Sequence, residues 1–537
     1  MKALTEQGLP VNNHRSVSSV VNDKNYDKKE DYPMDVIKKA LPILLVMFLC
    51  FTVLAACDRN RNDKGGDRTR AVSEVQPSGD AGSGETDAAQ NEDTKKAKSL
   101  PPMTAENITL SYASWENEVL TTHLAKRFME KYPNITVEVI TLPLEGYNDA
   151  LLNLVASGQM PDAFWILGEC DFAIANQLLG DMTEYWENDP ESDNVLKTIN
   201  EGRFGYYGTD RKWATPVKFF PETIFANKAL FEQLNVEMPP MDWTWEEMVE
   251  YVKKMTVPEL GIYGFNQYRR IVTWYPVAAD DNCWGEFGWD GQSFDFTNWA
   301  DGINLEAELI NGGYHAPPFG SDEAEKAFGD RNMWAADSGK IAFQFDAWWT
   351  FNNLFAQDKY LEKGLIYVPY LVPRAKGTTS KHTMGTLDFG GISSATEYPR
   401  EAYELLKFMN WSEEGWMAKL EAYSTLTNPD GSRLSLDALP ITLSEKVWQE
   451  VRKFFPGDDD PYGRGPWFDY FLEHCKEPIP YGGTMIPGFA TFLAEGYAGV
   501  EDAVINGGVN AHDFVRDLTE KANAANREAM KAFETYE

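Results

Sequence analysis

Residues 108–140 read ITLSYASWENEVLTTHLAKRFMEKYPNITVEVI and decide the fold. They begin with a strand at 108–115, in which apolar and polar residues alternate at first, and run into a second strand at 134–143. Between the strands, apolar residues recur at the spacing of one helix face. These residues are Val119, Leu120, Leu124, Phe128 and Met129. The pattern therefore predicts a strand, a helix and a strand in succession.

The next stretch repeats the same order. Residues 147–159, YNDALLNLVASGQ, read as a second helix, and 161–167, PDAFWIL, read as a third strand. Strands that alternate with helices predict a parallel sheet with helices on both faces. In such sheets ligands bind beyond the carboxyl ends of the strands. Trp115, Glu116 and Trp165 fall at those ends, so they are candidates for ligand contact.

The length and charge of the chain limit its architecture and partners. A chain of 537 residues exceeds what one core usually organises, so we expect two lobes or domains. The net charge of −34 argues against nucleic acid or an anionic membrane surface as a partner. It favours an uncharged or cationic ligand, or it simply keeps an exported protein soluble.

The cysteines and histidines do not form a metal-binding pattern. Two of the five cysteines, Cys50 and Cys57, lie within or at the end of an apolar run. The other three, Cys170, Cys283 and Cys475, allow at most one internal disulfide. The sequence has no Cys-x-x-Cys or His-x-x-x-His spacing, and we predict neither a metal nor a cofactor.

An acidic stretch at 457–463, GDDDPYG, has two interpretations. Asp458, Asp459 and Asp460 could bind calcium through their carboxylates. Adjacent carboxylates diverge, however, and a calcium loop uses alternating ligands and a distant glutamate. A solvated acidic turn is the favoured interpretation.

The only long apolar run, ALPILLVMFLCFTVLAA at 40–56, follows two lysines and is typical of a signal peptide. It is short for a membrane span, which needs about 20 apolar residues. The sequence LAAC at 54–57 resembles the lipobox of bacterial lipoproteins. That resemblance implies a diacylglyceryl group on Cys57, which would anchor the protein to the membrane. The alternative is a transmembrane helix with an incidental cysteine.

The segments around this run do not read as folded. Residues 1–56 combine a polar N-terminal extension with the signal peptide, and Met34 is our hypothesis for the true start. Residues 57–103 are rich in Gly, Ser, Asp, Glu and Lys and contain almost no aliphatic residues. We expect them to be a disordered tether, because they cannot bury enough apolar surface to fold.

Residues 343–354, FQFDAWWTFNNL, place Asp346 beside two consecutive tryptophans after a strand-like run. Trp348 and Trp349 are either core residues or a platform for a ligand, with Asp346 fixing the ligand's polar edge. Neighbours on an extended chain point to opposite faces, so we expect only one of the two indoles to stack on a ligand.

Several segments, taken in order, resemble the family 1 extracellular solute-binding proteins, the sugar-binding lipoproteins of bacterial ABC importers. They are AKRFMEKYPNITVEVI at 125–140, SGQMPDAFWI at 157–166, WATPVKFFPETIFANKALFEQL at 213–234, DWTWEEMVEYVKKM at 242–255, GKIAFQFDAWWTFNNL at 339–354 and GGISSATEYPREAYELLKFM at 390–409. The sequence departs from the family pattern where Ala226 replaces a tyrosine and Ala347 replaces a glycine.

This resemblance implies a two-lobed α/β fold of the periplasmic-binding-protein type II class, with a hinge and a ligand cleft between the lobes. The N-terminal lobe is expected to take 104–216 and 371–425. The C-terminal lobe is expected to take 217–370 and 426–537.

A sugar presents an apolar face and a rim of hydroxyls, so its site needs flat aromatic rings together with carboxylates, amides or arginine. The strand ends and the resemblance together imply these ligand-binding residues: Trp115, Glu116, Trp165, Glu169, Phe220, Trp284, Asp346, Trp348, Trp349, Asp388 and Tyr481. For each tryptophan the alternative is core packing. Phe220 replaces a polar residue of the family pattern.

The resemblance implies a function without catalysis. We expect a monomeric, lipid-anchored receptor on the extracellular face of the membrane, which captures an oligosaccharide and delivers it to the transmembrane subunits of an ABC permease. One alternative is the same fold binding a peptide, a polyamine or an iron complex. Another is a secreted glycoside hydrolase, which needs two carboxylates across the scissile bond, usually on a barrel or sandwich.

Overall fold

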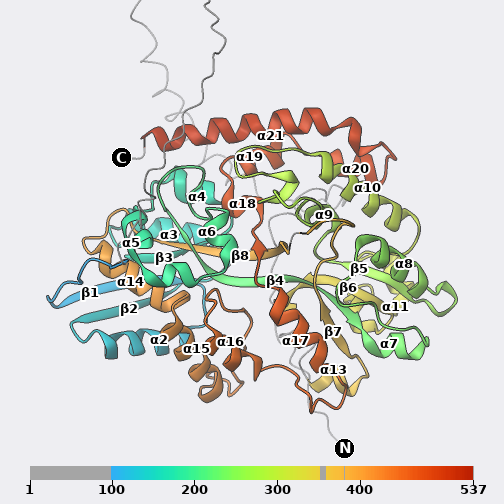
Figure 1. Ribbon diagram of the computed structural model, residues 1–537, viewed down its shortest axis with the longest axis horizontal. Helices are drawn as coiled ribbons and strands as arrows, with labels where there is room; N and C mark the ends of the chain where they lie inside the picture. The colour runs from blue at the N-terminus through green and yellow to red at the C-terminus, as the bar shows by residue number, and fades with distance from the viewer. Residues whose placement is uncertain (1–97, 351–357, 380, 536–537) are drawn as a thin grey trace, which may run out of the picture. The chain divides into compact units, whose positions relative to one another are not determined.

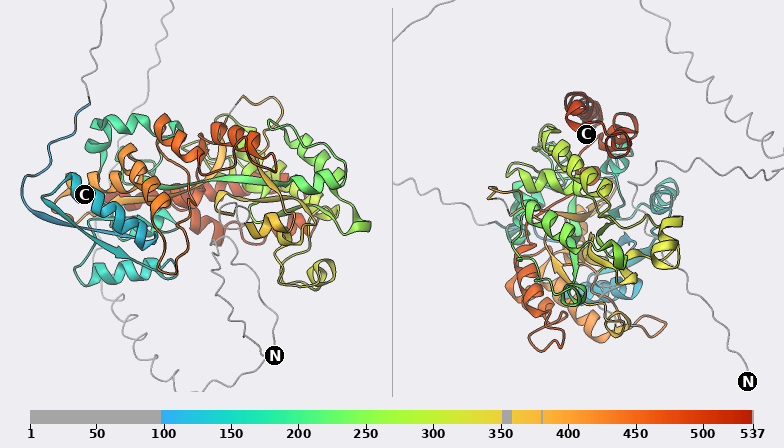
Figure 2. Two further views of the ribbon diagram at one scale, coloured as in Figure 1. Left: turned by 90° about the horizontal axis from the view of Figure 1, so that it is seen from below. Right: turned by 90° about the vertical axis from the view of Figure 1, so that its right-hand side faces the viewer.

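The computed structural model describes residues 98–350, 358–379 and 381–535 (Figure 1). Within them, one sheet runs in the strand order β2-β1-β3-β8-β4-β6-β5, with β7 paired to β4 and β9 paired to β8. Helices lie on both sides of this sheet (Figure 2). The predicted signal segment, the tether and the lipidation site Cys57 lie outside the described residues.

The first lobe is built on three parallel strands and confirms the predicted order of elements. β1 (Ile108–Ser114) lies between β2 (Ile135–Thr141) and β3 (Ala163–Ile166), and it is parallel to both. The helices α2 (Glu118–Lys131) and α3 (Tyr147–Ala156) connect them. In β1, every second residue from the start of the strand is buried, as the alternation in the sequence predicted.

Local capping explains where α2 begins. The side chain of Asn117 accepts hydrogen bonds from the backbone N–H groups of Val119 and Leu120, which have no partner inside the helix. The helix buries Leu120, Leu124 and Phe128 against the sheet, while Met129 at the edge of the predicted stripe is only partly buried.

The 13-residue strand β4 (Thr215–Asn227) belongs to both lobes. Its first half pairs antiparallel with β8 (Thr383–Ile392), as far as Pro221. From Glu222 onward it pairs with β6 (Ile341–Ala347), and on its other edge with β7 (Tyr367–Tyr370). Proline has no N–H to donate, so the change of partner falls where the ladder is weakest. The whole sheet is therefore mixed, although its first three strands are parallel.

The second lobe surrounds β5 (Tyr263–Gln267), which is parallel to β6. The helix α8 (Trp245–Met255) packs against both strands, Trp274 of α9 (Ile271–Ala279) stacks on Phe345 of β6, and α10 (Thr297–Asn311) packs against α9. Thr244 and Glu247 form a reciprocal capping box at the start of α8. A second hydrophobic cluster lies under the C-terminal helices and includes Phe287, Phe294, Phe296, Trp299, Phe489 and Phe492.

The remaining α-helices and the strand β9 connect and cover the two lobes. They are α4 (Cys170–Ala175), α5 (Thr183–Asn188), α6 (Lys197–Glu201), α7 (Lys228–Gln233), α11 (Asp322–Phe328), α12 (Trp348–Thr350), α13 (Asp358–Glu362), α14 (Pro399–Asn410), α15 (Glu413–Thr425), α16 (Glu445–Arg452), α17 (Gly465–His474), β9 (Pro478–Ile479), α18 (Gly482–Met485), α19 (Phe489–Glu495), α20 (Val500–Ile505) and α21 (Val515–Met530).

The structure shows the state of the three cysteines, of the acidic stretch and of the apolar helices. Cys170, Cys283 and Cys475 are free, buried thiols. In the acidic stretch, the carboxylate of Asp460 accepts hydrogen bonds from the Arg464 guanidinium at 2.8 and 3.1 Å. Across the described residues, no helix has both the length and the apolar character needed to cross a membrane.

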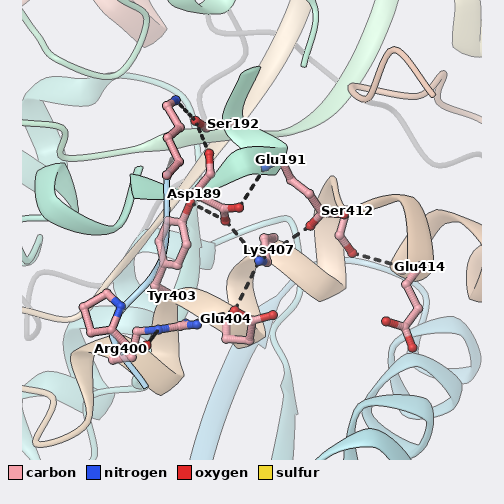
Figure 3. A network of polar contacts seen from close by, with 12 residues as sticks. Asp189, Glu191, Ser192, Arg400, Tyr403, Glu404, Lys407, Ser412 and Glu414 are labelled. Carbon is pink, nitrogen blue, oxygen red and sulfur yellow. Dashed lines mark hydrogen bonds and ion pairs between the residues drawn. The ribbon is translucent and has the colours of Figure 1, made fainter. Parts of the chain in front are cut away.

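A buried network of charges fixes α14 to the 3-10 helix η2 (Pro190–Asn194) in the first lobe (Figure 3). Lys407 Nζ lies 3.0 Å from Asp189 Oδ2 and 3.2 Å from Glu404 Oε2. Tyr403 donates a hydrogen bond of 3.1 Å to the same Asp189 oxygen, and Arg400 lies 2.9 Å from Glu404. Each buried carboxylate therefore has a cation beside it.

Replacing Lys407 with methionine should leave Asp189 buried without a cation. We expect Lys407→Met to lower the free energy of unfolding by about 3 kcal/mol, the usual effect of breaking a buried pair. Urea unfolding measures this change. The matched control is Lys446→Met, because Lys446 is 63% exposed in its pair with Glu413; there the loss should stay below about 1 kcal/mol. Equal losses in the two variants would contradict the role of the network.

Candidate functional site

The two crossing strands present one polar face, which we call the floor: Lys218, Phe220 and Glu222 of β4, with Thr386 and Asp388 of β8. Lys218 pairs with Asp388, and Phe220 with Thr386, in the antiparallel register. Alternate residues of a strand point to the same side, so these five side chains share a face. Val217 and Phe219, which alternate with Lys218 along β4, lie in the hydrophobic core on the other side.

Lys218 is the centre of a charge cluster on the first-lobe side of the floor. Its Nζ lies 3.2 Å from Glu116, just beyond β1, and 3.2 Å from Asp437. Burial alone would lower the pKa of Lys218, but Asp437 and Glu116 outweigh it and raise the pKa. Burial would likewise raise the pKa of Glu116, whereas Lys218 and Lys419 hold it below its usual range. Lys218 and Glu116 are therefore both charged at neutral pH.

Asp388 faces Lys218 across the two strands but is not bonded to it. Within the described part of the chain, its carboxylate makes neither a hydrogen bond nor an ion pair. Burial raises the pKa of Asp388 to about 6, against the opposing effect of Lys218. This carboxylate is partly exposed on the floor, and both Lys218 and Arg269 favour its charged form.

Arg269, which follows β5, connects the second lobe to the floor. Its Nη2 donates to Thr386 Oγ1 at 3.1 Å, and its Nε lies 3.5 Å from Glu222 Oε2. Thr386 in turn donates to Glu222 Oε1 at 2.9 Å. Burial raises the pKa of Glu222 to about 7, although Arg269 acts in the opposite direction. Residues of the second lobe and of both crossing strands therefore meet in one polar cluster.

Aromatic rings join the two charge clusters. The Trp349 ring packs edge to face on Phe220, with 5.2 Å between the ring centroids. The Arg269 guanidinium carbon lies 5.0 Å from the Trp349 centroid and 4.6 Å from that of Tyr481. Tyr268 beside it is 42% exposed. Trp349 is partly exposed, so it presents a ring surface next to the floor.

On the first-lobe side, Trp115 is also partly exposed. Its ring meets those of Trp165 and Tyr147 edge to face, with centroids 4.8 and 4.9 Å apart. Trp165 itself is buried and donates its indole N–H to Asn410 at 3.1 Å. Lys218 also lies near it, with Nζ 5.7 Å from the ring. Trp165 therefore supports Trp115 and Lys218 from beneath.

The two consecutive tryptophans have different surroundings. Strand β6 ends at Ala347, and Trp348 begins the short helix α12. Trp348 is fully buried and stacks on Phe471 at 4.8 Å, so it packs in the core of the second lobe, while Trp349 reaches the floor. Asp346 is buried and accepts hydrogen bonds from the Ala347 N–H at 2.8 Å and from Gln344 at 3.2 Å.

Two carboxylates flank the short helix α18 from opposite lobes. Glu169, from the first lobe, lies directly against Gly483, and burial raises the pKa of Glu169 to about 7. Glu286, from the second lobe, accepts a hydrogen bond of 2.7 Å from the Gly482 N–H. Burial raises the pKa of Glu286 to about 8.

The remaining predicted residue, Trp284, has its ring contacts with residues outside the floor. Its ring packs beside His382 and Phe204, with centroids 4.7 and 6.3 Å away. The structure thus brings together Trp115, Glu116, Phe220, Trp349, Asp388 and Tyr481 around the crossing strands.

Sequence reasoning missed Lys218, Glu222, Arg269, Thr386 and Asp437. One signal was available, because charged residues at Lys218 and Glu222 interrupt an otherwise apolar run at the same strand spacing. Arg269 and Asp437 lie in loops, and only the tertiary structure brings them to the floor.

Comparison with known proteins identifies the family. The profile of the bacterial extracellular solute-binding proteins matches residues 107–414, and the chain belongs to this family. This membership agrees with the predicted two-lobed α/β fold. A comparison with curated proteins gave no match.

Solved structures of similar fold cover most of the chain. A sugar transporter protein from Rhizobium etli in an open conformation has a TM-score of 0.59 at 16% identity, covering 78% of this chain and 99% of its own. The sugar-binding protein MalE from Xanthomonas citri has a TM-score of 0.56 at 13% identity, covering 80% and 99%. A cyclo/maltodextrin-binding protein complexed with maltotetraose has a TM-score of 0.55 at 17% identity, covering 78% and 96%. At these identities the likeness establishes the fold alone.

The buried carboxylate Glu286 predicts a pH-dependent stability. The folded protein keeps the proton of Glu286 up to about pH 8, whereas an exposed glutamate releases it near pH 4.3. Its contribution to stability is therefore fully present at acidic pH and is lost as the pH rises through 8. In Glu286→Gln, the melting temperature should fall less between pH 5 and 9 than in the unchanged protein.

Thermal unfolding across this pH range measures the effect. Glu259→Gln is the control, because Glu259 is exposed on the second lobe. A melting temperature that falls equally in Glu286→Gln and the unchanged protein would show that Glu286 does not titrate differently on folding.

Proposed function

We propose that the protein captures an oligosaccharide between its lobes and delivers it to the transmembrane subunits of an ABC permease. The observation that carries this proposal is the partly exposed Trp349 ring on Phe220, with a charge cluster on either side. An aromatic ring can accept the apolar face of a sugar, and the flanking charged groups can bond its hydroxyls.

The chemistry of the floor fits a ligand with many hydroxyls. Glu116, Asp388 and Glu222 offer acceptors, and Lys218 and Arg269 offer donors. A hydroxyl left without a partner in a closed site costs about 1–3 kcal/mol, so such groups set specificity. The complex of the similar maltodextrin-binding protein with maltotetraose supports this ligand class.

Closure would follow from contacts to both lobes. Trp115 and Glu116 belong to the first lobe, whereas Arg269 and Trp349 belong to the second. A ligand that touches both sets stabilises the closed arrangement relative to the open one. The permease could then distinguish the loaded receptor from the empty one.

The proposal also covers the membrane anchor, the bounds of the two lobes and the way the receptor acts. Cys57 carries the lipid anchor, and 57–103 is the tether. The N-terminal lobe takes 104–216 and 371–425, and the C-terminal lobe takes 217–370 and 426–537. The receptor acts as a monomer on the extracellular face of the membrane and has no catalytic activity.

Removing the Trp349 ring should weaken sugar binding. In Trp349→Ala, the affinity for the bound oligosaccharide should fall about 30-fold, corresponding to the ~2 kcal/mol of a buried aromatic anchor. Tryptophan fluorescence and thermal shift measure binding across malto-, cello-, xylo- and chito-oligosaccharides. A saturating ligand at 100 times its dissociation constant should add about 2.7 kcal/mol of stability.

The matched control is Phe319→Ala, which removes a 67% exposed aromatic ring elsewhere on the second lobe. This variant should bind as the unchanged protein does. If no oligosaccharide of the panel changes the fluorescence or the melting temperature, the proposed ligand class is wrong.

A further inference from the structure

Arg269 lies in a short connection, residues 268–270, between the end of β5 and the start of α9. Its guanidinium donates to Thr386 and lies beside Glu222 on the floor. The place of this guanidinium therefore depends on the path of a connection of only three residues. The side chain that bonds both ends of the connection comes from α10, on the side away from the floor.

That side chain is Glu306, which is fully buried in α10. Its carboxylate accepts four hydrogen bonds, and among the residues that the structure describes all four come from 267–272. Oε1 accepts from the side-chain amide of Gln267 at 3.0 Å and from Nε and Nη2 of Arg270 at 2.9 and 2.6 Å. Oε2 accepts from the backbone N–H of Val272 at 3.0 Å. One carboxylate thus bonds the residue before the connection and the residues at its end.

The start of α9 explains why a charged group is buried there. The first N–H groups of a helix have no partner inside it, and this end carries a partial positive charge. Val272 is the second residue of α9, so Glu306 accepts from one of these N–H groups. Arg270 supplies a cation beside Glu306, and its Nη1 also pairs with Glu501 of α20. The buried carboxylate is therefore partnered by the segment that carries Arg269.

The floor holds the tip of Arg269 but not its backbone. Nη2 donates to Thr386 at 3.1 Å, whereas Nε lies 3.5 Å from Glu222 and makes no hydrogen bond in the described structure. A long side chain with one such bond does not determine where its own backbone lies. A binding group is precise when neighbouring residues fix its position, so the support from behind the connection matters for recognition.

We propose that Glu306 is a positioning residue for ligand binding: by bonding both ends of the connection, it holds the Arg269 guanidinium where it donates to the hydroxyls of the ligand. This inference rests on the proposed function, because it assigns a support to one of the groups that bind the sugar. Glu306 does not itself meet the ligand, since its carboxylate is fully buried and faces residues 267–272.

A buried carboxylate at the start of a helix also stabilises the fold, so the experiment must separate two roles. A purely structural role predicts a loss of affinity that does not depend on Arg269. A positioning role predicts that the loss of affinity disappears when Arg269 is absent. A double-mutant cycle distinguishes the two, because it measures the coupling between the two side chains.

The test is calorimetric titration of the full-length protein in detergent with maltotetraose, cellotetraose, xylotetraose and the N-acetylglucosamine tetramer. Glu306→Gln replaces two acceptor oxygens by one oxygen and an NH2 group, which faces hydrogen-bond donors whichever way it turns. We expect the affinity for each tetrasaccharide that binds the unchanged protein to fall about tenfold, the effect of losing one hydrogen bond to a charged group.

The second arm of the cycle uses Arg269→Met, which keeps an unbranched side chain and removes the guanidinium. In this background Glu306→Gln should change the affinity by less than about twofold, because the group that it positions is gone. Tryptophan fluorescence at high sugar concentration measures the weaker complexes. A tenfold loss in both backgrounds would overturn the inference.

The matched control is Glu404→Gln, because Glu404 is a buried carboxylate of the first lobe that lies beside Arg400 and Lys407. It should lower the melting temperature and leave the affinity within about twofold of the unchanged protein. Equal losses of affinity in Glu404→Gln and Glu306→Gln would contradict the positioning role. If Glu306→Gln does not fold, Glu306→Asp takes its place in the cycle, since it keeps the charge and withdraws the carboxylate by one methylene group.

The remaining outcomes separate this inference from the proposed function. An unchanged affinity in Glu306→Gln would overturn the inference and leave the oligosaccharide function standing. If the unchanged protein binds none of the four tetrasaccharides, the proposed function is overturned, and the inference that rests on it is overturned as well.

Discussion

The architecture depends on the backbone pairing of a single strand. β4 is buried along its whole length, so nearly all of its N–H and C=O groups must find partners. It meets this constraint by pairing with β8 as far as Pro221 and with β6 and β7 beyond it. Because one continuous strand serves both halves of the sheet, the two lobes are joined by hydrogen bonds and not only by a flexible connection. The position of the lobes and of the floor between them follows from that pairing.

This same constraint explains why charged residues occur inside a buried strand. A strand of 13 residues that passes between two lobes cannot place every side chain in an apolar core, and one face meets the polar groups of both lobes. Lys218 and Glu222 are tolerated there because Glu116, Asp437 and Arg269 come within ion-pair distance. Burying charge in this way does little for stability. Its structural result is a single polar surface at the crossing strands, with Trp349 beside it.

The sequence predicted local structure well and long-range pairing poorly. The alternation in 108–115 and the helical stripe after it predicted β1 and α2, since both patterns arise from contacts within a few residues. The antiparallel insertion of β8 beside β3 was not predictable from periodicity, because it joins segments more than 200 residues apart. Trp115, Glu116 and Phe220 were identified from strand ends and from resemblance. Arg269 and Asp437 were not, because no pattern distinguishes such loop residues from solvated charges. The sequence did not show which of Trp348 and Trp349 is buried. That difference follows from the end of β6 at Ala347, which only the structure locates.

The strand order has a consequence for how the chain is made. β8 lies between β3 and β4 in the first lobe, yet its residues follow all of β5, β6 and β7. As the chain emerges from the ribosome, the N-terminal strands therefore have an open edge until residue 392 has appeared. The first lobe can be completed only after the strands of the second have been synthesised, so long-range contacts delay its folding. A protein of this topology therefore has an incomplete first sheet until most of its chain has been synthesised.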